Sequence, residues 1–164
     1  MFDLVLERRF LALVPMIVLA IAGCSSGQAS PSSGAASASP AAASGTTMEV
    51  TLKEWSVLPV PDSVAAGSVT FKVTNTGPND VHEFVVLKTD LDAGALPTDA
   101  NGAVSESGAG IEVEGEIEDI AVGASAELPL TLAAGKYVLL CNIYDDTEKE
   151  AHYKMGMRIG FTVT

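Results

Sequence analysis

Residues 48–164 are divided into short runs in which apolar and polar side chains alternate, separated by clusters of turn-forming residues. Such alternation places the apolar side chains on one face of an extended segment, as in a half-buried β-strand. The expected strands are residues 48–57, 68–75, 82–88, 111–119, 126–132, 136–142 and 158–164. Short strands at this spacing predict an all-β sandwich of Greek-key type around a single core.

Residues 90–110 interrupt this pattern. The stretch is rich in Gly, Ala, Asp and Ser, and it is too long and too polar to be a tight hairpin. We therefore expect an excursion between two strands that carries no strand of its own and has room for one short helical turn.

The predicted strand at 111–119 alternates strictly and carries four glutamates on one face, at 112, 114, 116 and 118. Its other face carries Ile111, Val113 and Ile117, which we expect to pack on the core. A row of glutamates would suit a cation site or a docking surface, but charges on a surface strand also discourage sheet-to-sheet aggregation. We prefer the second interpretation.

The N-terminal segment has the composition of an export signal. Two arginines precede a mostly apolar run at 10–21, which closes on the small residues before Cys24 and resembles the lipobox of bacterial lipoproteins. The run is short for a membrane-spanning helix, which needs about 20 residues. We predict a signal peptide at 1–23 and an acylated Cys24 that anchors the protein outside the cytoplasm, at the cell membrane or the outer membrane. A plain transmembrane anchor or an ordinary cleaved signal is the alternative.

Residues 24–47 form the predicted tether between this anchor and the folded domain. After Cys24 the tether contains no charge and no large apolar side chain, so burial cannot offset the entropy of ordering it. The folded part is then 48–164, which is enough for one domain with its own core.

The predicted domain is strongly acidic. All but two of the 21 acidic residues lie in it, with seven of the nine basic ones, and the chain has a net charge of −12. Such a charge opposes binding to nucleic acid or anionic lipid, so we expect membrane contact through the lipid anchor only. It favours a partner protein with a basic patch, although solubility alone would also explain it.

Four side chains have metal-binding chemistry. Cys141, His152 and Met157 share one stretch near the C-terminus, and His82 opens an apolar run far upstream. A thiolate, two imidazoles and a thioether form the ligand set of copper in blue electron-transfer sites. The chain has only two histidines, and both fall where such a site would need them.

The cysteine count supports this interpretation. The chain has two cysteines, and acylation of Cys24 would leave Cys141 without an internal partner in an oxidising compartment. Such a thiol forms an intermolecular disulfide, acts as a nucleophile, binds a metal, or is buried and inert. Zinc also binds cysteine and histidine, but structural zinc sites usually contain further thiolates and rarely a methionine. The ligand set therefore favours copper.

Four segments carry a resemblance to a known family. They are Asn-Thr-Gly at 75–77, His-Glu-Phe-Val-Val-Leu at 82–87, Gly-Lys-Tyr-Val-Leu-Leu-Cys-Asn-Ile at 135–143, and His-Tyr-Lys-Met-Gly-Met at 152–157 before a closing strand. With these segments the chain resembles the cupredoxins, the plastocyanin- and azurin-like blue copper proteins. The resemblance covers essentially the whole domain.

The resemblance implies a cupredoxin-like sandwich with one type 1 copper per chain. His82, Cys141 and His152 would be the equatorial ligands and Met157 the axial one. Met155 remains a rival for the axial position. His152, on the loop, would be the exit for electrons.

One feature departs from the pattern of the family. Small cupredoxins separate the cysteine from the second histidine by a few residues, whereas ten residues lie between Cys141 and His152, five of them charged. We expect this loop to replace an apolar docking rim by acidic side chains. The loop begins with Asn142, which we expect to hydrogen-bond across the site and orient the ligand loop.

The function expected from these features is the transport of single electrons between extracytoplasmic redox partners by a monomer. The alternatives are a copper-delivery lipoprotein without redox turnover and a metal-free cupredoxin-like interaction module. We expect no enzymatic activity, because both histidines are used in one site and none remains for a second copper centre or a Ser-His-Asp triad.

Overall fold

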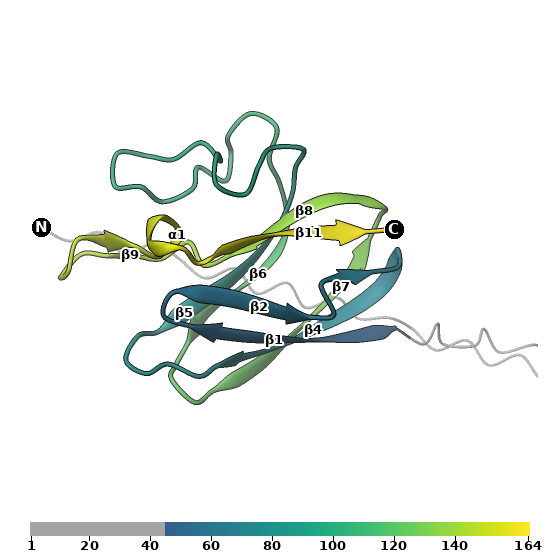
Figure 1. Ribbon diagram of the computed structural model, residues 1–164, viewed down its shortest axis with the longest axis horizontal. Helices are drawn as coiled ribbons and strands as arrows, with labels where there is room; N and C mark the ends of the chain where they lie inside the picture. The colour runs from purple at the N-terminus through teal and green to yellow at the C-terminus, as the bar shows by residue number, and fades with distance from the viewer. Residues whose placement is uncertain (1–44) are drawn as a thin grey trace, which may run out of the picture. The chain divides into compact units, whose positions relative to one another are not determined.

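The structure of the protein, a computed structural model, describes residues 45–164. They form two β-sheets that enclose a core, together with one short helix (Figure 1). The predicted signal peptide, Cys24 and nearly all of the tether lie outside the described residues. Within the described part, no helix is long or apolar enough to cross a membrane.

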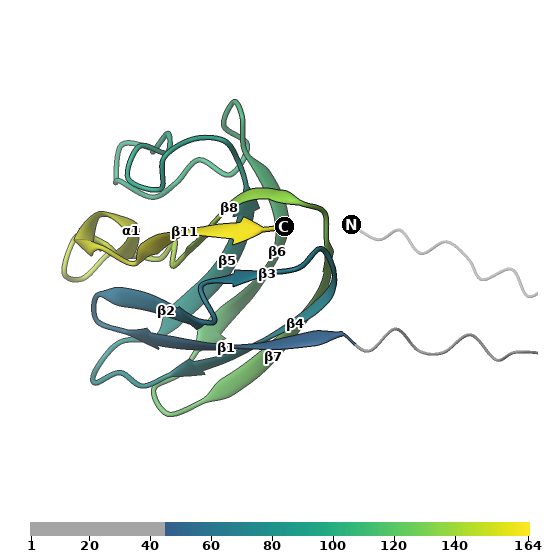
Figure 2. The ribbon, with the colours of Figure 1, turned by 45° about the vertical axis from the view of Figure 1, so that its right-hand side comes forward.

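The two sheets form separate layers (Figure 2). The first sheet has the order β2 (Ser56–Val60), β1 (Thr46–Lys53), β4 (Gly67–Asn75), β7 (Ser125–Leu132). The second sheet has the order β3 (Ser63–Val64), β11 (Arg158–Val163), β8 (Gly135–Leu140), β5 (His82–Lys88), β6 (Glu112–Ile120). A separate pair, β9 (Tyr144–Asp145) and β10 (Glu150–Ala151), precedes helix α1 (His152–Met155).

The chain crosses repeatedly between the layers. It passes from β4 in the first sheet to β5 in the second, returns from β6 to β7, and crosses again to β8. Both sheets are mixed, because β1 runs parallel to β4 and β3 runs parallel to β11. The all-β Greek-key sandwich predicted from the alternating pattern is confirmed.

The core between the sheets follows from the alternation. In β4, the side chains of Val69, Phe71 and Val73 are buried, and the residues that alternate with them are partly or fully exposed. The ring of Phe71 lies 5.4 Å from that of Phe84 and 6.1 Å from that of Phe161, both in the second sheet, measured between ring centroids. Each such aromatic side chain contributes about 2–3 kcal/mol through burial, so these three rings hold the layers together.

The strand predicted at 48–57 is instead a hairpin, and this prediction was wrong. Strand β1 ends at Lys53 and β2 begins at Ser56, and the two pair antiparallel with Leu52 opposite Val57. Both of these apolar residues are buried, because facing residues of a hairpin point to the same side of the sheet. Strand β1 begins at Thr46, two residues inside the stretch predicted as tether.

Strand β6 lies at the edge of the second sheet and does not have the regular buried face that its sequence predicts. Val113, expected in the core, is 38% exposed, whereas Ile117 is half-buried against the core. The pairing with β5 shifts register between Val86 and Leu87, and such a bulge changes the face that the following residues present. Glu112, Glu116 and Glu118 are exposed, as expected.

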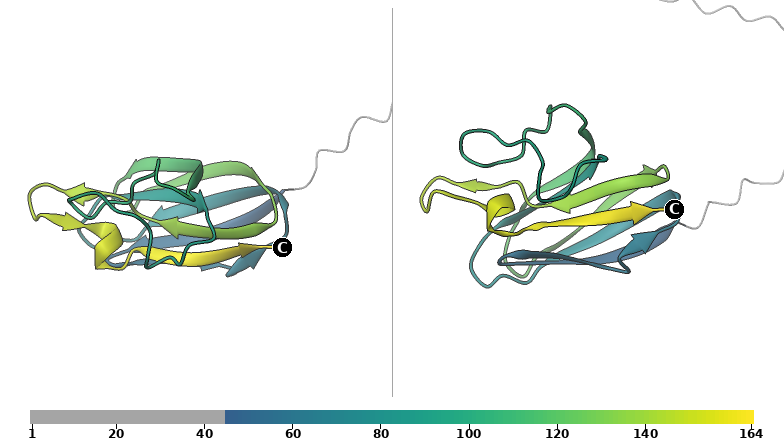
Figure 3. Two further views of the ribbon diagram at one scale, coloured as in Figure 1. Left: turned by 90° about the horizontal axis from the view of Figure 1, so that it is seen from above. Right: turned by 45° about the horizontal axis from the view of Figure 1, so that its top comes forward.

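The excursion at 90–110 covers the outer face of the second sheet (Figures 1 and 3). The excursion contains no helix, so the allowance for a helical turn was wrong. Its strand-like pairing is limited to an isolated β-bridge between Thr98 and Val104. Its apolar side chains form a second buried cluster with the sheet, made of Val85, Leu87, Leu96, Val104, Val138, Leu140 and Tyr153. Strand β5 is therefore buried on both faces, which explains its continuous apolar run.

Candidate metal centre

The four predicted ligands lie at or next to the ends of three strands of the second sheet, β5, β8 and β11. His82 is the first residue of β5, Cys141 follows the last residue of β8, His152 opens α1, and Met157 lies between α1 and β11. Because β5 and β8 are adjacent and antiparallel, the start of one and the end of the other lie at the same end of the sheet. The loop with β9, β10 and α1 extends from this end (Figure 3).

Three donor atoms converge there. The Sγ of Cys141 lies 3.4 Å from Nδ1 of His152 and 4.0 Å from Nδ1 of His82, and the two Nδ1 atoms are 3.3 Å apart. A point about 2 Å from all three atoms lies inside this triangle, and metal bonds to imidazole nitrogen and thiolate sulfur are about 2.0–2.3 Å long. The described residues thus bring together a Cys and two His that fit a single metal ion.

The two candidates for the fourth ligand differ in burial. Met157 is fully buried, whereas Met155 is 42% exposed. The backbone of Met157 also lies beside the donors, because its C=O accepts a 3.0 Å hydrogen bond from Cys141 N–H and its N–H donates to the C=O of His152 at 3.1 Å. The buried group of His82, Cys141, His152 and Met157 fits one type 1 copper site.

The site keeps its thiol protonated until a metal arrives. Cys141 is the free cysteine of the described residues and is fully buried. Burial raises the pKa of its thiol to about 12, against the opposing effect of a hydrogen bond from the N–H of Glu83 to Sγ at 3.2 Å. A metal ion must therefore displace a proton on binding, and the hydrogen bond then stabilises the thiolate.

Both histidines are kept neutral in the absence of a metal. Burial lowers the pKa of His82, and its proximity to His152 lowers it further. Burial also lowers the pKa of His152, although the carboxylates of Asp80 and Asp145 oppose this. Neutral imidazole is the form that binds metal ions.

The loop before β5 is organised by Asn75, the last residue of β4. Its side chain is fully buried, and its Nδ2 donates hydrogen bonds to the C=O groups of Asp80 and Ile120, both at 2.8 Å. Its Oδ1 accepts the N–H of Gly77 at 2.8 Å. Gly77 has φ of +64°, a conformation that favours glycine, and a Cβ there would lie 2.7 Å from Val122. The Asn-Thr-Gly turn thus places the residues that lead into His82.

Two further residues connect the ligand loop to the excursion. The side-chain amide of Asn142 bonds to the backbone of Val104, as acceptor at 2.6 Å and donor at 3.1 Å, and donates to Glu106 at 2.8 Å. It therefore orients the loop from outside the site rather than across it. The hydroxyl of Tyr153 donates to the C=O of Ala93 at 2.8 Å and accepts the N–H of Leu96 at 3.1 Å.

Two neighbours of the site escaped the sequence analysis. Glu54 and Trp55 form the turn between β1 and β2, in a segment whose alternation predicted an uninterrupted strand. The indole of Trp55 packs edge-on against the imidazole of His152, with ring centroids 5.0 Å apart. Nothing in their local sequence indicates this role, because it depends on contacts with residues far away in the chain, such as that between Trp55 and His152.

A groove lies next to His152. It is lined by Asn79, Asp80, Val81, Asp119, Ile143, Tyr144, Asp145, Asp146 and His152. Four of these side chains are carboxylates, and His152 is the one candidate ligand among them. Asp145 and Asp146 of the loop before His152 line this groove, and so do the apolar side chains of Val81 and Ile143.

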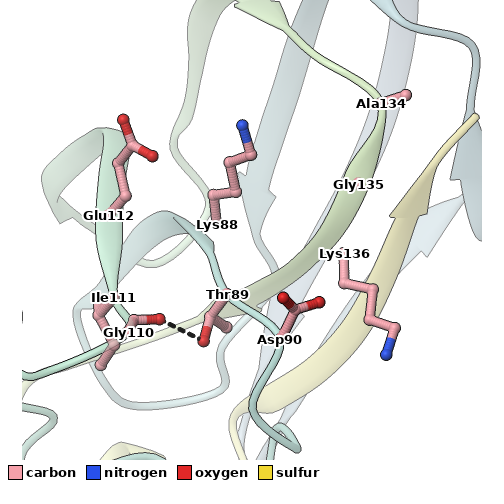
Figure 4. A pocket seen from close by; sticks show the side chains of 9 residues that line it. All are labelled: Lys88, Thr89, Asp90, Gly110, Ile111, Glu112, Ala134, Gly135 and Lys136. Atoms are coloured by element: carbon pink, nitrogen blue, oxygen red, sulfur yellow. Dashed lines mark hydrogen bonds between the residues drawn. The ribbon is translucent and has the colours of Figure 1, made fainter.

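A second pocket lies at the opposite end of the same sheet, where β5 ends and β8 begins (Figure 4). Lys88 and Lys136 line it together with Asp90 and Glu112. The two lysine side chains point away from each other, and Figure 4 shows no converging set of polar groups.

The comparisons with known proteins support the fold. No protein-family model matches the sequence, and no curated protein is significantly similar to it. Among solved structures, dithionite-reduced auracyanin from Roseiflexus castenholzii matches 73% of this chain and 97% of its own, with 22% identity and a TM-score of 0.51. Auracyanin B matches 73% of this chain and 88% of its own, with 21% identity and a TM-score of 0.50. Both are cupredoxins, and the described domain has the cupredoxin fold, as the sequence resemblance implied.

Proposed function

We propose that this protein is an extracytoplasmic type 1 copper protein that carries single electrons between redox partners. The observation that carries the proposal is the buried triangle formed by Cys141, His82 and His152, with Met157 buried beside it. A thiolate, two imidazoles and a weak thioether suit both copper oxidation states. The copper, when bound, supplies the one-electron chemistry.

The protein supplies a rigid and dry environment for that chemistry. His82 and the residue before Cys141 belong to paired strands, and the three donor residues are at most 2% exposed. A site of this kind rearranges little when an electron arrives or leaves, and this favours fast transfer over copper delivery. Because His152 lines the groove, we assign to it the contact with the electron donor and acceptor.

Addition of copper(II) to the full chain is expected to produce an intense visible charge-transfer band, because a thiolate–copper bond is formed. In the Cys141→Ser variant this band should be absent, while the far-ultraviolet circular dichroism stays that of the wild type. Visible absorption measures both. A colourless wild-type protein with a free thiol and unbound copper would overturn the proposal and leave a metal-free interaction module.

The rate of copper loss separates an electron carrier from a delivery protein. Copper in the carrier is expected to resist a competing chelator for hours, because the donor residues are buried. Loss of the band within seconds would instead support delivery without redox turnover.

The partner is proposed to be a redox protein with a basic patch that docks on the acidic groove. Four carboxylates line this groove around His152, and the chain has a net charge of −12. Opposite charges accelerate encounter and orient the partner. No catalysis beyond electron transfer is proposed, because both histidines of the chain belong to one site.

Electron transfer to a small basic redox protein is expected to slow several-fold as the salt concentration rises. The screening length falls from about 30 Å at 0.01 M to about 10 Å at 0.1 M. Combined Asp119→Asn and Asp146→Asn substitutions in the groove should flatten this dependence; Asp119 has φ of 53°, which asparagine tolerates. The salt dependence is obtained from electron-transfer rates measured by stopped flow at several salt concentrations. The charge-matched control is the double variant Asp90→Asn with Glu112→Gln, at the opposite pocket. Equal slopes for the two double variants would contradict docking at the groove.

We further propose that the domain is a monomer tethered through an acylated Cys24 and residues 25–47 to the cell membrane or outer membrane. This proposal rests on the sequence of the export signal and the uncharged tether, since both lie almost entirely outside the described residues. A flexible tether would let the acidic domain move between its partners without binding the lipid surface itself.

A further inference from the structure

Glu54 is held in a fixed position by the loop that precedes β5. Only 10% of its side chain is exposed, and its Oε1 accepts the backbone N–H groups of Asn79 at 2.9 Å and Asp80 at 2.7 Å. Burial acts to raise the pKa of this carboxyl, but the hydrogen bonds from Asp80 and Asn79 outweigh it and the pKa is lowered. Two backbone N–H donors therefore hold the Glu54 carboxyl group next to the start of β5.

This carboxylate faces the nitrogen of His82 that the donor triangle does not use. The Oε1 of Glu54 lies 3.9 Å from Nε2 of His82, whereas Nδ1 of the same ring faces Cys141 and His152. Within residues 45–164, neither Nε2 of His82 nor Oε2 of Glu54 has a hydrogen-bond partner. Each of these two side chains therefore carries a buried polar atom without a partner, and the carboxyl group of Glu54 approaches the unpartnered Nε2 of His82 to 3.9 Å through Oε1.

We propose that Glu54 is a positioning residue that selects the tautomer of His82. A carboxylate accepts hydrogen bonds and cannot donate them, so it stabilises the ring form that carries its proton on Nε2. The lone pair of Nδ1 is then directed at Cys141 and His152. A metal-binding histidine commonly donates its second N–H to such a partner, which fixes the ring and makes it a stronger donor.

The same carboxylate acts on the metal through its charge. This part of the inference rests on the proposed copper function. A negative charge behind His82 stabilises Cu(II) more than Cu(I), because the higher charge is attracted more strongly. Solvent cannot take the place of Glu54 next to Nε2 of His82, because His82 is fully buried.

A purely structural role of Glu54 predicts a different result for the Glu54→Gln variant. If Glu54 served only to cap the backbone N–H groups of Asn79 and Asp80, the Glu54→Gln variant would keep an oxygen for both bonds and change nothing at His82. The Asp99→Asn variant is a matched control. The carboxylate of Asp99 caps three backbone N–H groups in the excursion, those of Asn101, Gly102 and Ala103, and contacts neither histidine.

The tautomer is measured first, in the metal-free full chain labelled with ¹⁵N. Two-bond proton–nitrogen spectra distinguish the two ring forms. We expect the Nε2–H form of His82 alone in the wild type and in Asp99→Asn, and a mixture of both forms in Glu54→Gln. An Nδ1–H ring in the wild type, or an unchanged ring in a folded Glu54→Gln variant, would overturn the inference. This measurement needs no copper, so it separates a failure of the inference from a failure of the proposed function.

The reduction potential is measured second, in the copper-loaded chain. Loss of the charge in Glu54→Gln is expected to weaken Cu(II) binding relative to Cu(I) at least tenfold, which corresponds to a rise of about 59 mV for one electron. The Glu54→Asp variant keeps the charge and should stay closer to the wild type. If Glu54→Gln does not fold, the ring form of His82 in the wild type decides the inference. A potential in Glu54→Gln no different from that of Asp99→Asn counts against the inference.

Discussion

Replacement of Asn75 by alanine is expected to lower the free energy of unfolding by about 3 kcal/mol, because buried polar groups left without a partner cost about 1–3 kcal/mol each. The side chain is fully buried and makes three hydrogen bonds, to the C=O groups of Asp80 and Ile120 and to the N–H of Gly77. Alanine removes all three bonds and leaves a cavity. Denaturant unfolding of the metal-free protein measures the loss.

Two further variants make this prediction specific. Asn75→Asp keeps the size and the acceptor oxygen but removes the Nδ2 donor, so it should be destabilised nearly as much as the alanine variant. Asn79 lies in the same loop with an exposed side chain, and Asn79→Ala should change the stability by less than about 0.5 kcal/mol. A loss below about 1 kcal/mol for Asn75→Ala would show that the loop does not depend on this side chain.

The Met157→Leu variant is expected to bind copper with a reduction potential raised by roughly 60 mV, the equivalent of a tenfold change in relative affinity for one electron. Met157 is fully buried next to the donors, and removal of its thioether takes electron density from Cu(II) more than from Cu(I). Leucine conserves the volume, so the stability should fall by less than about 1.5 kcal/mol. Voltammetry and thermal unfolding measure the two effects.

The Met155→Leu variant decides which of the two methionines is the axial ligand. Met155 is 42% exposed, and Met155→Leu should leave both the potential and the stability unchanged. A potential that moved in Met155→Leu but not in Met157→Leu would reverse the axial assignment. It would also require α1, which ends at Met155, to adopt a different conformation when copper binds.

The candidate ligands can be predicted from the sequence because their chemistry is rare in this chain. There are two histidines and, apart from the predicted acylation site Cys24, one cysteine, so few combinations had to be considered. The strands that carry them were predicted from alternation, which records directly which face of an extended segment is buried. The positions of β4, β5, β7, β8 and β11 agree with the predicted ranges to within a few residues.

The wrong predictions for the strand at 48–57 and for the burial of Val113 have a common physical origin. Alternation describes one strand at a time, and it does not report how strands pair. It therefore missed the turn at Glu54 and Trp55 that makes a hairpin of β1 and β2. It also placed Val113 in the core, although a bulge in the pairing with β5 leaves this residue 38% exposed.

Contacts between distant residues also decided the details of the site. Spacing alone left Met155 as a rival to Met157, and only the packing of the loop after β8 showed which side chain is buried. The same holds for Glu54, which approaches His82 because the β1–β2 turn lies against the loop before β5.

The sequence by itself determined the fold class, the position of most strands and the candidate donor set, because hydrophobic alternation and ligand chemistry are properties of the residues themselves. The tertiary structure decided which atoms face each other. It placed three donors within 4.0 Å of one another, buried one methionine, and set a carboxylate behind His82. Such distances depend on how the two sheets pack, and packing is a property of the whole chain rather than of any segment.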